Sequence, residues 1–234
     1  MMIKRRSHLL LLLLIFHFCC YKLSGQNSQA IKNFTLDTIG QQAYYHESSL
    51  KPAALILPGS LLLYGCLKPV INGIPKLDNK IMKDIQQRHP GFHTNAADYL
   101  MWAPSASVYA MDALHVKTAH NFREHLIIEA GSVIITGGIG YGMRLISRNI
   151  DAYKINNTKF PSGHTANAFR AAEILHQELK KYHPVLSYSG YVVATSVGML
   201  RIYGKEHFLS EVLAGAGLGM LSTKLTYWIF NKVK

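Results

Sequence analysis

The chain has 234 residues, 49% of them hydrophobic, and a formal net charge of +12. This length suits one domain preceded by a leader and is ample for a core. Basic and aromatic residues are not interleaved as in nucleic-acid-binding proteins, so we expect no nucleic-acid partner. The basic surface favours anionic lipids or phosphorylated substrates, although a merely solubilising surface explains the charge equally well.

The N-terminus has the form of a secretory signal. A basic start at residues 4–6 precedes the apolar run 9–20, and Leu23-Ser-Gly-Gln follows it. The apolar run is shorter than the roughly 17–25 residues of a membrane-spanning helix. We therefore predict that residues 1–25 are a signal peptide, cleaved after Gly25, and that the protein is exported. An uncleaved anchor is the alternative.

The rest of the chain has helical patterns and no strand-like alternation of note. Residues 26–94 form a polar lead-in with a first apolar helix, Pro52–Val70, and a short helix near Asp78–Gln87. Residues 95–234 contain five further helix-like segments: 98–114, 124–147, 165–180, 186–203 and 207–230. We predict an all-α fold, a helical bundle of about five or six helices with its core in residues 95–234.

Two of these segments are long and apolar enough to cross a membrane. Leu126–Met143 and Val212–Phe230 are nearly uncharged, and Gly215-x3-Gly219 would allow close helix packing in lipid. We expect the bundle to be embedded in a membrane. The alternative is a soluble or peripheral periplasmic bundle.

Two polar motifs combine the residues needed to hold a phosphate and cleave its ester. Phe160-Pro-Ser-Gly-His-Thr165 is a turn that leads into a helix, whose free N–H groups and dipole favour an anion. Arg201-x5-His207-x3-Glu211 follows later and places His207 and Glu211 on one helix face. There the carboxylate can accept a hydrogen bond from one imidazole nitrogen and leave the other free to attack.

Together the two motifs resemble the second and third motifs of the type 2 phosphatidic-acid phosphatases, over roughly residues 95–230. That superfamily includes vanadium haloperoxidases and bacterial acid phosphatases. The resemblance implies that His207 attacks phosphorus and forms a phosphohistidine, that Glu211 holds its tautomer, and that His164 protonates the leaving oxygen. It also implies four phosphate-binding residues: Arg144, Ser162, Gly163 and Arg201. No metal or other cofactor is implied.

The first family motif, Lys-x6-Arg-Pro, is altered in this chain. An ungapped alignment places Arg144 on the lysine and Asp151 on the arginine. Arginine contributes roughly 1.5–3 kcal/mol to phosphate binding, whereas a carboxylate there repels phosphate by a few kcal/mol. Activity would then be slow or shifted in substrate. Lys154 or Arg148 could replace the arginine, or Asp151 could be a solvated loop residue outside the pocket.

We therefore predict an exported phosphatase of phosphomonoesters or pyrophosphates, with lipid phosphates as substrates. It would lie in the inner membrane with its active site facing the periplasm. One alternative is a non-catalytic family member that binds anionic lipid headgroups. Another is a soluble periplasmic acid phosphatase of broad specificity. A vanadate-dependent haloperoxidase is disfavoured, because the chain lacks the large additional helical scaffold usual there.

Two further patterns have simpler interpretations. The glycine-rich run Gly137–Gly142 resembles a phosphate-binding loop, but it lies in a helical stretch without a preceding strand. We therefore attribute these glycines to helix packing. His115, His120 and His125 are five residues apart, which fans them around a helix or loop and disfavours a metal site.

Overall fold

The computed structural model describes residues 51–153 and 160–233. The predicted signal peptide and Lys154 lie outside these ranges. Neither range contains a β-strand, so the predicted all-α bundle is confirmed. Its α-helices are α3 (Pro52–Cys66), α4 (Gly73–Arg88), α5 (Ala96–Leu100), α6 (Ala103–Ala113), α7 (Phe122–Ser147), α8 (Gly163–Leu179), α9 (Ser189–Tyr203) and α10 (Leu209–Val233).

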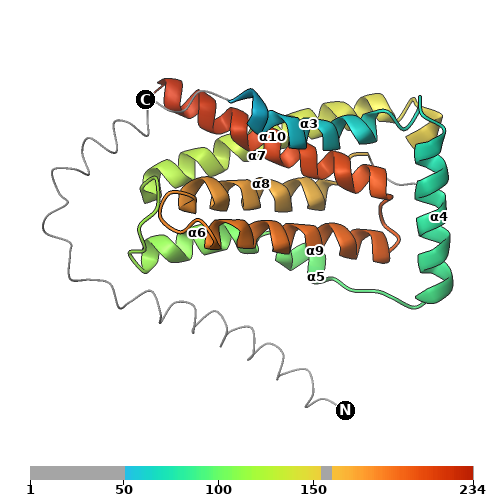
Figure 1. Cartoon of the computed structure of the whole chain (residues 1–234), viewed down its shortest axis with the longest axis horizontal. Helices are drawn as coiled ribbons and strands as arrows, with labels where there is room; N and C mark the ends of the chain where they lie inside the picture. Colours follow the sequence, from blue (N-terminus) through green and yellow to red (C-terminus); the bar gives the residue numbers. More distant parts are fainter. Residues whose placement is uncertain (1–50, 154–159, 234) are drawn as a thin grey trace, which may run out of the picture. The chain divides into compact units, whose positions relative to one another are not determined.

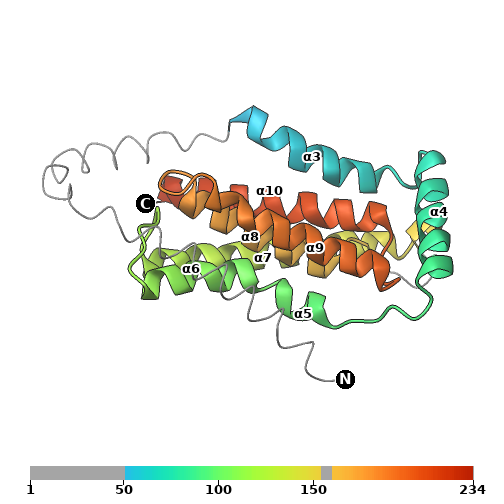
Figure 2. The ribbon, with the colours of Figure 1, turned by 60° about the horizontal axis from the view of Figure 1, so that its bottom comes forward.

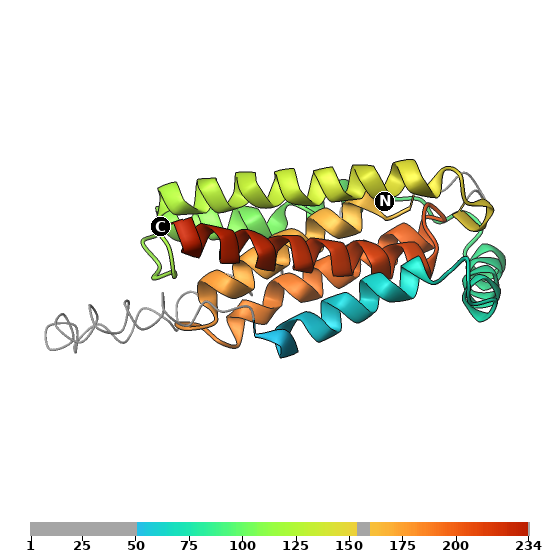
Figure 3. The same cartoon turned by 90° about the horizontal axis from the view of Figure 1, so that it is seen from above.

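Helix α10 is the central helix of the bundle. It packs against α3, α7, α8 and α9, and the views in Figures 1 and 3 show it between them. Its glycines make close approach possible, because a Cβ at Gly219 would collide with the carbonyl of Ala166 in α8. One at Gly217 would collide with the backbone of α3 at Pro58. The close helix packing expected at Gly215-x3-Gly219 is therefore present, and it brings α8 onto α10.

The expected helical segment 98–114 is in fact two helices. Helix α5 ends at Leu100, and α6 begins at Ala103 with Pro104 in its first turn. Proline has no N–H to donate and clashes with the preceding turn, so it is tolerated at a helix start and breaks a helix interior. The break leaves Asp98 on a short helix of its own, which packs on α8 and α9.

Helix α7 differs from the other long helices in what it exposes. A capping box between Asn121 and Glu124 fixes its start. Within the described ranges it alone is long and apolar enough to cross a membrane, and only 17% of its most apolar stretch is buried. The other expected span, Val212–Phe230, lies in α10, where most side chains are buried in the bundle.

The core lies along α8 and α10, and α4 runs across one end of the bundle (Figures 1 and 2). One buried cluster joins Val108, Ile128, Leu175 and Tyr227 at the end remote from α4. Small residues such as Ala168 and Ala194 pack α8 closely on α9. This packing fixes the helix ends that carry the polar motifs.

Candidate active site

The helix ends that carry the two motifs lie at the same end of the bundle. The start of α8, the end of α9, the start of α10 and the end of α7 all point toward α4 (Figure 1). The backbone N–H of Ser162 donates a hydrogen bond to the carbonyl oxygen of Glu211 at 3.1 Å. The two motifs are thus joined directly through backbone atoms.

His207 and Glu211 form a buried pair. Nδ1 of His207 lies 2.9 Å from Oε2 of Glu211, and the backbone N–H of Phe208 donates to the same oxygen at 3.3 Å. His207 precedes α10, which begins at Leu209, so the expectation that both residues lie on one helix face is wrong. His207 instead lies in the loop between α9 and α10. Its backbone N–H donates a hydrogen bond to the carbonyl oxygen of Arg201 in α9 at 3.2 Å. A proton on Nδ1 leaves Nε2 of His207 with a free lone pair.

Lys68 lies between the carboxylates of Asp78 and Glu211, and sequence reasoning missed both Lys68 and Asp78. Nζ of Lys68 lies 3.7 Å from Oε1 of Glu211 and 3.2 Å from Oδ2 of Asp78, and all three side chains are buried. Asp78 also accepts hydrogen bonds from the backbone N–H of Ser210 at 3.0 Å and from its hydroxyl at 2.5 Å. Lys68, beside Pro69, gave no sequence signal of burial, whereas Asp78 lies at helical spacing from Ile74 and Met82 on the apolar face of α4, which could have indicated it.

His164 has a carboxylate partner that the sequence did not reveal. Its Nε2 lies 2.8 Å from Oδ1 of Asp98 in α5, and Nη1 of Arg201 lies 3.6 Å from the same oxygen. Burial, followed by the nearby Arg201 guanidinium, lowers the pKa of His164, while Asp98 opposes that shift. Arg201 also forms an ion pair with Glu206. The structure therefore brings His164 and Arg201 together around one carboxylate.

Arg144, the phosphate ligand that the ungapped alignment predicts, lies near the end of α7. Its Nη2 would be 3.8 Å from a Cβ on Gly163, so the guanidinium lies beside the start of α8. The buried Nε atoms of Arg144 and Arg201 have no hydrogen-bond partner within the part of the chain that the structure describes. Ser162 is fully buried, and its hydroxyl pairs with that of Thr165 at 2.9 Å.

The three residues left uncertain by the sequence have different positions. Asp151 is exposed at the start of the short 3-10 helix η1 (Asp151–Tyr153). Arg148 is exposed directly after α7. Lys154 lies outside the described residues. Whether Asp151 faces a bound phosphate stays a prediction.

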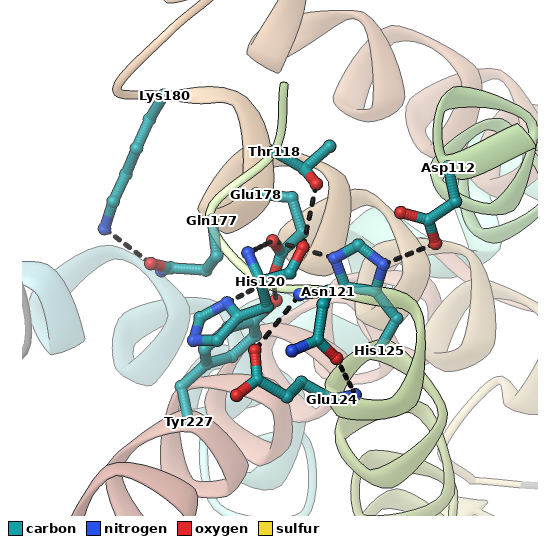
Figure 4. Close-up of polar contacts among 10 residues, drawn as sticks. All are labelled: Asp112, Thr118, His120, Asn121, Glu124, His125, Gln177, Glu178, Lys180 and Tyr227. Atoms are coloured by element: carbon teal, nitrogen blue, oxygen red, sulfur yellow. Dashed lines mark hydrogen bonds and ion pairs between the residues drawn. The ribbon is translucent and has the colours of Figure 1, made fainter. Parts of the chain in front are cut away.

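Two further histidines, His120 and His125, form a second buried cluster around Glu178, near the end of α8 (Figure 4). Nδ1 of His120 lies 2.9 Å from Oε1 of Glu178, and Nε2 of His125 lies 3.0 Å from its Oε2. Tyr227 donates to Glu178 at 2.5 Å, and Asp112 lies 2.7 Å from Nδ1 of His125. No group of residues within 51–153 and 160–233 has the arrangement of a metal site. These contacts join α6, α7, α8 and α10.

The glycine-rich run in α7 does not serve helix packing as expected. A Cβ added at Gly137, Gly138 or Gly142 would meet no atom within 4 Å. One at Gly140 would only touch Leu218, at 3.4 Å. The interpretation was wrong for Gly137, Gly138 and Gly142, which point in different directions around α7 and at which no neighbouring helix approaches closely.

Comparisons with known proteins agree with the two motifs. A family model described as the PAP2 superfamily matches residues 54–234, and so begins earlier than the motifs alone indicated. The lipid A 1-phosphatase of Porphyromonas gingivalis is 29% identical over 143 residues, which are 61% of this chain and 32% of that protein. The phosphatidylglycerophosphatase B of Bacillus subtilis is 36% identical over 83 residues, 32% of this chain and 40% of that protein. The chain thus matches less than half the length of either relative.

One solved structure is also similar. It is a transmembrane PAP2 type phosphatidylglycerolphosphate phosphatase from Bacillus subtilis, with a TM-score of 0.42 and 22% sequence identity. The match covers 76% of this chain and 98% of that structure. The family that was predicted from two short motifs is confirmed by the family match, which extends over most of the chain. This chain belongs to the PAP2 superfamily.

Proposed function

We propose that this protein is a phosphatase that hydrolyses a phosphomonoester or pyrophosphate group of a lipid through a phosphohistidine at His207. The observation that carries the proposal is the buried pair of His207 and Glu211, in which Nδ1 faces the carboxylate at 2.9 Å. That contact favours the tautomer whose Nε2 is unprotonated and nucleophilic. Family membership and two relatives named as lipid phosphatases support the same reaction class.

In the proposed reaction, Nε2 of His207 bonds to phosphorus while the bond from phosphorus to the leaving oxygen breaks. Protonated His164 gives its proton to that oxygen, and the alcohol or phosphate leaves. His164 then takes a proton from water, whose oxygen bonds to phosphorus while the bond from Nε2 of His207 to phosphorus breaks, so that inorganic phosphate leaves and His207 is restored. Arg144 and Arg201 would stabilise the charge on the non-bridging oxygens, since both present buried N–H groups without another partner in the described ranges.

The proposed setting is the periplasmic side of the inner membrane, with the signal peptide removed. The support is the largely exposed, apolar surface of α7. If the protein is integral, alkaline carbonate should leave it in the membrane fraction. Its release into the supernatant would instead favour the soluble periplasmic phosphatase.

The first test is phosphate release from a panel of lipid phosphates: phosphatidate, phosphatidylglycerol phosphate, a polyprenyl pyrophosphate and a phosphorylated glycolipid of the lipid A type. The wild type is compared with His207→Ala and with His183→Ala, a matched histidine beyond the far end of α8. Release that is lost in His207→Ala alone supports the proposal.

One feature favours a second candidate, a non-catalytic member that binds anionic headgroups. It is Asp151, which replaces the first-motif arginine with a residue of opposite charge. This candidate predicts no release above the His207→Ala level by a folded wild type across a wide pH range, together with binding to vesicles that contain phosphatidate.

A further inference from the structure

The guanidinium of Arg201, a proposed phosphate ligand, already has two carboxylate partners. Its Nη2 forms an ion pair with Oε2 of Glu206, and its Nη1 lies 3.6 Å from Oδ1 of Asp98. The same oxygen of Asp98 lies 2.8 Å from Nε2 of His164. Both terminal nitrogens of Arg201 therefore face acidic side chains at the place where a phosphate is expected.

Carboxylate and phosphate oxygens use the same donors. The planar guanidinium group binds either anion through paired N–H groups, and both kinds of contact are charge-assisted. A phosphate that binds the terminal nitrogens of Arg201 must therefore displace Glu206, or remain beside it against the repulsion of like charges. Either event subtracts from the affinity of the site for phosphate.

The backbone of the turn after α9 directs Glu206 toward Arg201. The backbone N–H of Glu206 donates a hydrogen bond to the carbonyl oxygen of Arg201 at 3.0 Å. The preceding residue, Lys205, has a φ of 60°, in the left-handed region that residues with a Cβ rarely adopt, and its Nζ donates to the carbonyl oxygen of Pro90 at 2.7 Å. Gly204 leaves room for the acidic side chain, since a Cβ there would lie 3.2 Å from Oε1 of Glu206. The turn therefore holds Glu206 beside the guanidinium.

The exposure of each partner shows which one can move. The side chain of Arg201 is 10% exposed and that of Glu206 is 38% exposed. Glu206 can therefore turn into water and stay solvated, whereas Arg201 remains enclosed beside the motif residues. Asp98 is also exposed, but it is held by His164 as well, so Glu206 is the carboxylate that a phosphate displaces more readily.

We propose that Glu206 competes with phosphate for Arg201 and thereby makes the site bind free inorganic phosphate weakly. An ester substrate offsets the displacement of Glu206 through contacts of its remaining portion, whereas inorganic phosphate has no such portion. Glu206 thus favours the substrate over the released product and limits product inhibition. This inference rests on the proposed function, because it takes Arg201 as a phosphate ligand, and it deepens that function by assigning a residue to product release.

The test compares Glu206→Gln with Asp84→Asn in the full-length protein. Asp84 pairs with Arg88, both are exposed, and their helix α4 runs across the same end of the bundle (Figure 1). Asp84→Asn therefore removes one negative charge at this end without removing a partner of Arg201. Isothermal titration calorimetry in detergent, at one ionic strength, measures the Kd for inorganic phosphate. We expect Glu206→Gln to lower this Kd about tenfold, which corresponds to about 1.4 kcal/mol, and Asp84→Asn to leave it unchanged.

A second comparison tests whether the effect acts through Arg201. In an Arg201→Gln background, Glu206→Gln should change the Kd for inorganic phosphate less than about twofold, or leave binding too weak to measure, because the shared cation is gone. Melting temperatures control for folding. A tenfold gain that persists in this background would show that Glu206 repels phosphate without occupying Arg201, and the proposal would be wrong.

Unchanged, weaker or unmeasurable phosphate binding by Glu206→Gln overturns the inference, since Glu206 then does not compete. An equal gain in Asp84→Asn also overturns it, because net charge alone would explain both. With p-nitrophenyl phosphate as the substrate, the Ki of inorganic phosphate should fall about tenfold in Glu206→Gln. If the wild type hydrolyses no phosphate ester, the proposed function fails, and the comparison of Kd values still decides the role of Glu206.

Discussion

The two ends of the bundle each pair two histidines with acidic residues, yet they differ in what those histidines can reach. At the end remote from α4, His120 and His125 both contact Glu178, and their side chains are 1% exposed. At the motif end, Glu211 contacts His207 together with Lys68, and His164, which pairs with Asp98 instead, is 31% exposed. Buried arginine N–H groups without partners in the described ranges occur at the motif end. At the far end two histidines share one enclosed carboxylate, whereas at the motif end each histidine has its own carboxylate and His164 is partly exposed.

The largest effect should come from removing the carboxylate beside the proposed nucleophile. Glu211→Gln keeps the size of the side chain but no longer stabilises a proton on Nδ1 of His207, so kcat should fall on the order of a thousandfold. Phosphate release measures this, and the yield and melting temperature of the variant control for folding. If Glu211→Gln kept a near wild-type kcat, Glu211 would have a structural role like that of Glu178, and the two ends would not differ in function.

The corresponding change at the other end should affect stability and leave catalysis unchanged. Glu178→Gln leaves His120 and His125 without their shared anion, which should cost about 3 kcal/mol of unfolding free energy. Urea unfolding in detergent measures the loss. A fall in kcat of the folded variant that matches the fall for Glu211→Gln would show that the far cluster is part of the catalytic machinery.

The far cluster also predicts an acid dependence. Burial opposes ionisation of Glu178, but the hydrogen bonds and charges of His120 and His125 outweigh it and lower its pKa from 4.5 to about 2. Because the folded pKa is lowered, Glu178 contributes stability that is fully present above pH 4.5 and is lost as the pH falls toward about 2. Unfolding free energy in this window should decline more steeply for wild type than for Glu178→Gln.

A smaller catalytic effect is expected from the support behind Glu211. Lys68→Met removes the cation that lies between Asp78 and Glu211, so Glu211 should shift and orient His207 less well. We expect a loss of kcat of about tenfold to a hundredfold with KM nearly unchanged. Lys68→Arg should recover part of that loss. If both variants lose only stability and keep kcat, Lys68 has a structural role alone.

The smallest effect should be a shift in pH dependence at His164. Asp98 raises the pKa of His164 against burial and Arg201. Asp98→Asn should therefore lower that pKa further, and a smaller fraction of the proposed general acid would be protonated at neutral pH. The alkaline fall in kcat/KM should move to lower pH, and activity at acidic pH should be largely retained. An unchanged profile would mean that His164 does not supply the proton.

The sequence was sufficient for features that depend on local pattern. Helical periodicity predicted the bundle, and two short motifs predicted the family and the meeting of His164, Arg201 and His207. Long-range contacts were not predictable in this way. Asp78 is 132 positions from Ser210, so its partner could not be read from the sequence, although its helical spacing from Ile74 and Met82 was a local sign of burial. The break before Pro104 could have been read from the proline, and with it the separate position of Asp98.

The hydrogen bond from the Ser162 amide to the Glu211 carbonyl has a consequence for how this protein can diverge. Because backbone atoms make the link, exchanging either side chain for another that is not proline leaves it intact. The start of α8 and the start of α10 can thus keep their register while the residues they display change. The backbone link therefore constrains the positions of the two helix starts more tightly than the identity of the side chains that they present.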